Sequence, residues 1–94
     1  MAVYVVTWNL NKEGAAYTTA RATFLKHLAK YDKTQDSGLE TVRWISTNES
    51  AQQVSEYLRQ KLDDNDRLFV SKVVSGTHAG WLEKSVWTWI DARL

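Results

Sequence analysis

Few side chains in this chain could carry chemistry, and most of them stand alone. The two histidines, His27 and His78, are far apart in the sequence, and neither has a partner at metal-ligand spacing, so no zinc pattern is present. No Gly-x-Ser-x-Gly sequence occurs, so serine-based catalysis has no support. We expect structural roles for both histidines; the alternative is that His78 acts as an acid or base in a mobile loop.

The acidic residues Asp63, Asp64 and Asp66 form a second candidate site. Their carboxylates could hold a divalent cation, but the run lacks the length and the closing glutamate of a calcium loop. Short acidic and amide side chains readily bond their own backbone in turns. We therefore expect a solvated turn here and no metal site.

The five tryptophans could stack on nucleic-acid bases. Trp8, Trp44 and Trp89 fall on the apolar faces of predicted elements, and we expect them in the core. Trp81 and Trp87 are freer to act as surface or interface groups. Tryptophan often anchors protein interfaces, so these two residues are the candidates for binding a protein partner.

Asn9, near the end of the apolar run 2–10, is the remaining candidate. A polar side chain at the carboxyl end of a strand, next to a turn, is where α/β folds usually present chemistry. Side chains on a strand alternate between its two faces, so Val3 and Val5 share one face, and the other face carries Tyr4, Val6, Trp8 and Leu10. Asn9 is therefore the candidate site residue. The sequence assigns no catalytic residue.

The elements that must position these residues alternate along the chain. Apolar spacing predicts strands at 2–10, 33–35, 40–47 and 67–74, of which 33–35 is short and poor. It predicts helices at 15–31, at 51–62 and from 83 onward. The capping-box sequence from Ser50 to Gln53 predicts a sharp start for the second helix. The order is typical of an α+β, ferredoxin-like sandwich: a mainly antiparallel sheet with helices on one face and an extra C-terminal helix.

The predicted strands 2–10 and 67–74 are apolar on both faces. We therefore expect 67–74 to lie centrally in the sheet, and we expect the face that the helices leave open to need another cover. The simplest cover is a second copy of the chain. This predicts a homodimer whose interface includes Val3, Val5 and Asn9.

Length and composition bound the class of protein. The 94 residues predict one domain, 1–94, and the formal net charge of +1 provides no strong field toward nucleic acid or an acidic membrane. No cysteine is present, which excludes disulfides and thiolate chemistry and fits a reducing, cytoplasmic location. The apolar run at the start is too short to span a membrane, so we expect no membrane association.

Four short stretches, at 4–14, 41–53, 62–68 and Gly80-Trp81 with Trp89, are spread over nearly the whole length of the chain. They resemble a group of short bacterial proteins labelled SinR-like, which are related to the small CRISPR-associated endoribonuclease of the adaptation machinery. The resemblance implies a ferredoxin-like fold and a homodimer built across the open sheet face. In the CRISPR branch it also implies metal-dependent cleavage of RNA or DNA.

In that branch an aspartate at the end of the first strand, usually after an aromatic residue, meets its dimer mate and binds magnesium. Trp8-Asn9 stands at this position here. An amide is neutral, so two asparagines would offer the cation two fewer negative charges than two aspartates. The departure argues against magnesium catalysis by that route.

The sequence therefore predicts a small dimeric binding or regulatory module associated with nucleic acid, with no cofactor. A phosphate contact needs a cation near the polar strand end or the dimer cleft, and Lys12, Arg21 and Arg43 are the candidates.

Two alternatives stay open. The first is a magnesium-dependent endonuclease acting on RNA or DNA, in which Glu13 or Asp66 compensates for Asn9. The second is a protein-partner binding module that uses Trp81 and Trp87.

Overall fold

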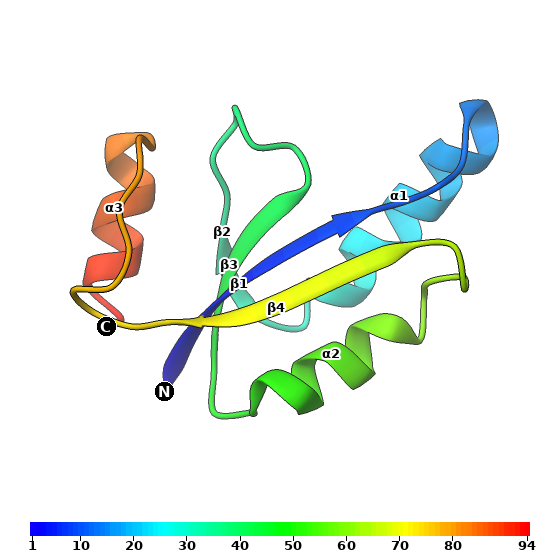
Figure 1. Cartoon of the computed structure of the whole chain (residues 1–94). Coiled ribbons are helices and arrows are strands. Elements are labelled where there is room, and N and C mark those ends of the chain that lie inside the picture. The colour runs from blue at the N-terminus through cyan, green and yellow to red at the C-terminus, as the bar shows by residue number, and fades with distance from the viewer.

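A computed structural model describes residues 1–94 as four strands and three helices. In chain order the elements are β1 (Ala2–Asn9), α1 (Gly14–Leu28), β2 (Asp32–Thr34), β3 (Val42–Thr47), α2 (Ala51–Arg59), β4 (Arg67–Val73) and α3 (Lys84–Asp91). Each element predicted from apolar spacing is present, with ends that differ by a few residues (Figure 1). None of the three helices is long and apolar enough to cross a membrane.

The strands form one antiparallel sheet in the order β2-β3-β1-β4. This confirms the predicted α+β class and is consistent with a ferredoxin-like fold. The expectation that 67–74 lies centrally was wrong, because β4 is an edge strand. Its two apolar faces have another cause. Leu68 packs with the core under α1 and α2, whereas Val73 packs with α3 on the other side.

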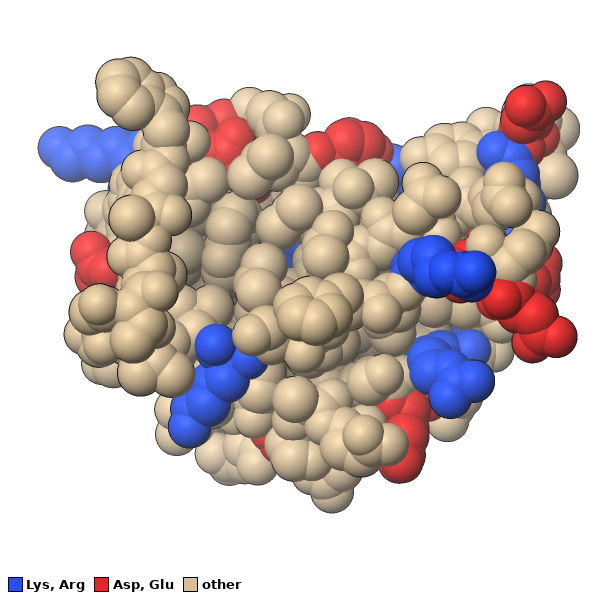
Figure 2. All heavy atoms as spheres, in the orientation of Figure 1, with Lys and Arg blue, Asp and Glu red and all other residues tan.

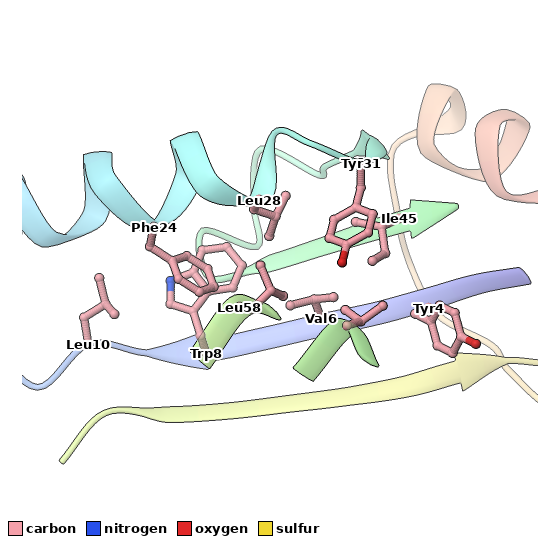
Figure 3. Close-up of a cluster of buried hydrophobic side chains, with 10 residues drawn as sticks. Tyr4, Val6, Trp8, Leu10, Phe24, Leu28, Tyr31, Ile45 and Leu58 are labelled. Carbon is pink, nitrogen blue, oxygen red and sulfur yellow. The ribbon is translucent and has the colours of Figure 1, made fainter. Parts of the chain in front are cut away.

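The main core lies between the sheet and the pair α1 and α2 (Figures 1 and 3). Trp8 meets Phe24 of α1 with ring centroids 4.8 Å apart, and Val54 and Leu58 of α2 are fully buried. The cluster consists of apolar side chains, most of which the period-two and helical spacings already place inward. The buried members are Tyr4, Val6, Trp8, Leu10, Phe24, Leu28, Tyr31, Ile45, Val54 and Leu58.

The start of α2 is the capping box that the sequence predicts. The Gln53 amide donates to Ser50 Oγ at 3.1 Å, and the Ser50 amide donates to Gln53 Oε1 at 2.8 Å. Two backbone N–H groups that the helix itself cannot satisfy are thereby paired.

The third helix, α3, packs on the opposite face of the sheet. Val86 and Ile90 lie against Val3, Trp44 and Val73, which form a second buried cluster. The second face is therefore open only in part, since α3 supplies some of the cover that we expected from a second copy. Val3 is 0% exposed under α3 and offers no surface to another molecule.

Polar contacts hold α3 at both ends. The amide of Glu83, just before the helix, donates to Asp36 Oδ2 at 2.7 Å, and Ser37 donates to the Glu83 carboxylate. After the helix, Arg93 Nε donates to Asp32 Oδ2 at 2.9 Å. Both acidic partners come from β2 and the loop that follows it, so this edge of the sheet fixes the position of α3.

Candidate binding site at the end of β1

Asn9 is the last residue of β1 and is exposed. In the register between β1 and β4, Asn9 lies opposite Arg67 and Thr7 lies opposite Phe69. Residues directly opposite each other on antiparallel strands share a face. These four side chains therefore project from the face that carries α3, but beyond the residues that α3 covers.

A shallow hollow of about 230 Å³ lies at this corner of the sheet. Its lining comprises Thr7, Trp8, Asn9, Arg67, Leu68 and Phe69, and it contains no carboxylate. Phe69 is 62% exposed, although it is a large apolar side chain in a regular strand.

The Arg67 guanidinium is held by its own turn. Its Nη1 donates to the carbonyl oxygens of Asp64 at 3.1 Å and Asp66 at 2.9 Å. No protein group accepts from its Nε or Nη2, and no carboxylate forms an ion pair with it. The corner thus presents an anchored cation, an exposed aromatic ring and a neutral amide.

Asp66, named above as a possible substitute metal ligand, has a structural role instead. Its side chain is 1% exposed and accepts from the amides of Asn11 and Asp63, each at 2.8 Å, and from Lys12 Nζ. Burial alone would raise the pKa of Asp66, but these hydrogen bonds outweigh it and hold the pKa below its usual range. The carboxylate joins the loop after β1 to the loop before β4.

Lys12 is enclosed by the same cluster. Its ammonium lies 2.9 Å from Asp63 and 3.0 Å from Asp66. Hydrogen bonds to Asp63 and then to Asp66 raise the pKa of Lys12. Its charge is thus matched inside the protein rather than offered to a phosphate.

The other two residues predicted to contact phosphate, Arg21 and Arg43, also bind groups within the protein. Arg21 Nε donates to Glu40 Oε1 at 2.7 Å. Arg43 is 3% exposed; it donates to the carbonyl oxygens of Glu40 and Val42 and lies 5.2 Å from the Trp8 ring centroid. Burial lowers the pKa of Arg43. The structure therefore brings none of the three cations to the face of Asn9.

The carboxylates do not gather at Asn9 either. Glu13 is the exposed N-cap residue of α1 and does not line the hollow. Nowhere in the chain do three or more His, Asp or Glu side chains come together in a group that could hold a metal ion. No such group therefore surrounds Asn9.

Both histidine rings are held by neighbouring groups. His27 stacks on Tyr57 at 3.7 Å between ring centroids, and its Nε2 lies 2.8 Å from the Tyr57 carbonyl oxygen. His78 Nδ1 lies 3.0 Å from the carbonyl oxygen of Val74. Each ring has a structural partner, and neither lines the hollow at Asn9.

Sequence reasoning found Asn9 but missed Arg67 and Phe69. The available signal was the alternation along 67–73, which places both residues on one face. Nothing in the sequence says that β4 pairs with β1, or in which register, and it is this pairing that brings them beside Asn9.

No family model, no curated protein and no solved structure matches this chain, so any function assigned to it depends on the geometry of its own residues.

Proposed function

We propose that this protein is a non-catalytic binding module that holds single-stranded nucleic acid at the end of β1. The observation that carries the proposal is the shared face of Asn9, Arg67 and Phe69. Single-strand binding sites combine aromatic rings, on which bases stack, with cations that contact the backbone.

Each residue has a separate role. The exposed ring of Phe69 stacks on a base, and the Arg67 guanidinium, fixed by two carbonyl oxygens, contacts a phosphate through its free N–H groups. The Asn9 amide can both donate to and accept from a base edge. Such contacts are sequence-tolerant, because every base has a face that can stack.

The absence of catalysis in this proposal follows from the donor groups at the site. Asn9 is neutral, the hollow around it contains no carboxylate, and the nearby Asp66 is saturated by hydrogen bonds. Hard divalent cations need several oxygen ligands, preferably charged ones.

Fluorescence anisotropy with labelled single-stranded RNA and DNA tests the proposal. Base stacking contributes about 1–3 kcal/mol, so Phe69→Ala should weaken binding roughly 5- to 150-fold. Arg67→Ala should weaken binding and reduce its salt dependence. Lys84→Ala removes an exposed cation at the start of α3 and serves as the control.

Two results would contradict this function. One is the absence of binding by the wild-type protein to any single-stranded oligonucleotide. The other is binding that Phe69→Ala and Arg67→Ala leave unchanged.

The endonuclease alternative has its own test. The wild type and Asn9→Asp are incubated with RNA and DNA in magnesium or manganese, with and without chelator. Cleavage that the chelator abolishes and that Asn9→Asp increases would favour the nuclease. Intact substrate with both proteins would reject the nuclease.

Self-association remains part of this proposal. Large apolar side chains, among them Phe69, Leu39 and Trp81, are left uncovered in the single chain. The partner-binding alternative uses Trp81 and Trp87, of which Trp81 is the more exposed.

A further inference from the structure

An apolar groove of about 330 Å³ runs between the sheet and α3, and none of its lining residues lines the hollow at Asn9. Val5 and Trp44 belong to the sheet, Trp87 and Ile90 come from α3, and nine of the eleven lining residues are hydrophobic. In Figure 2 the corresponding face is mostly tan, with a hollow beside the ridge at the left that contains α3 in Figure 1.

Trp81 stands at the rim of this groove and is 98% exposed. It belongs to the exposed segment that connects β4 to α3. A tryptophan is rarely left this open in a monomer, because its side chain is the largest apolar group available for burial. The chain thus places a projecting apolar group next to an apolar recess.

The chemistry of the lining decides what can occupy the groove. No Lys, Arg, Asp or Glu lines it, so it offers no charge to a phosphate. His78 is the lining residue with a titratable side chain, and its Nδ1 is already beside the Val74 carbonyl oxygen. Sites for small polar ligands need several converging polar groups, which this groove lacks.

We propose that the groove receives Trp81 of a second copy of this chain, and that the mutual exchange of Trp81 side chains forms the homodimer. A twofold interface uses the same patch on both subunits, so the patch must fit itself. A patch that carries both the projecting group and the recess meets this condition. The inference rests on the self-association in the proposed function and gives it a location.

The area available indicates a weak dimer. Two tryptophans bury up to about 250 Å² each, so the exchanged side chains contribute up to about 500 Å². Interfaces of this size belong to the weak, transient class. The net charge of +1 adds little repulsion between copies.

This location differs from the interface predicted above. Val5 lines the groove, but Val3 is buried by α3, and Asn9 is not among the residues that line the groove. The groove and the hollow at Asn9 share no lining residue, so the exchanged Trp81 does not itself fill the hollow. Two binding sites would then act together on one strand.

Sedimentation equilibrium from about 10 μM to about 1 mM tests the dimer. The wild type should associate reversibly, and Trp81→Ala should sediment as a monomer throughout. Leu94→Ala is the matched control, because it also removes an exposed apolar side chain but one that does not line the groove. It should associate like the wild type.

A second variant tests the recess. Leu39→Arg, at an exposed position that lines the groove, should block the recess while keeping Trp81. It should sediment as a monomer, like Trp81→Ala. Circular dichroism and thermal melts confirm that both variants fold.

Three results would overturn the proposal: a monomeric wild type at the highest concentration, association of Trp81→Ala equal to that of the wild type, or association of Leu39→Arg equal to that of the wild type. Weaker oligonucleotide binding by Trp81→Ala, with unchanged association, would assign the groove to nucleic acid instead. Failure of the wild type to bind oligonucleotides, with Trp81→Ala abolishing the dimer, would reject the nucleic-acid function and leave the exchange in place.

Discussion

At the scale of single residues, Asp66 shows how distant partners decide what a carboxylate does. Its two oxygens receive backbone N–H groups from two loops and the Lys12 ammonium between them. A buried carboxylate with its acceptor sites filled stabilises the fold and has no free oxygen for a cation.

Asp66→Asn should lower the free energy of unfolding by about 1–3 kcal/mol, because an amide cannot accept all of these hydrogen bonds. Urea unfolding measures the change. Asp64→Asn, at an exposed neighbour in the same turn whose side chain makes no hydrogen bond or ion pair, is the control and should be close to neutral.

The same residue makes stability depend on acid. The pKa of Asp66 is lower in the folded chain than the ordinary value of about 3.9. Its contribution is therefore fully present above the ordinary pKa and is lost as the pH falls through the lower folded-state pKa. Unfolding measured from about pH 6 down to about pH 2 should show this loss.

Asp66→Asn should reduce that acid dependence without removing it. The pKa of Glu49 is also lowered, by hydrogen bonds from Tyr31 and then Lys30, so its stabilisation disappears over the same range. A variant with the full acid dependence of the wild type would show that Asp66 does not titrate as described.

At the scale of elements, α3 is the part whose position was hardest to foresee. Its apolar residues recur at helical spacing, which predicts a helix but not the face that it covers. The contacts of Glu83 with Asp36 and of Arg93 with Asp32 hold it on the second face. Their partners are 47 and 61 residues apart in the sequence, so local spacing cannot predict either contact.

Asp36→Ala should loosen α3 selectively. The buried Asp36 carboxylate accepts the Glu83 amide, as an N-cap does, and such caps contribute about 1 kcal/mol. Hydrogen exchange should become faster in Lys84–Asp91, while Gly14–Leu28 keeps its wild-type rates. Arg93→Ala removes only a partly exposed ion pair and should have a smaller effect.

The capping box of α2 gives a simpler prediction at this scale. Ser50→Ala removes the side chain that accepts the Gln53 amide, so the free energy of unfolding should fall by about 1 kcal/mol. Chemical unfolding measures it. Ser50→Asp keeps the acceptor and should retain most of the stability.

At the scale of the whole molecule, the formal charge of +1 limits how nucleic acid can be held. Acidic partners occupy Lys12, Arg21, Lys30 and Arg93. With so few free cations at the proposed site, stacking must supply much of the affinity.

The salt dependence of oligonucleotide binding should therefore be shallow. One or two phosphate contacts give a slope of log K against log salt between about −0.7 and −1.4. Arg67→Ala should reduce that slope by about 0.7. A much steeper slope would indicate a broad basic surface and would contradict the assignment to Asn9, Arg67 and Phe69.

Local patterns alone determined the element order, the capping box at Ser50, the inward faces of β1 and the burial of Trp8 and Trp44. These features depend on residues a few positions apart, and periodicity reports such spacings directly.

Only the tertiary structure decided that β4 is an edge strand, that α3 covers Val3, and that Arg67 and Phe69 stand beside Asn9. The tertiary structure also pairs Lys12 with Asp66 and has Arg43 donate to backbone carbonyl oxygens. These outcomes depend on strand pairing and on hydrogen bonds between loops far apart in the chain. Such long-range partners leave no periodic trace in one sequence.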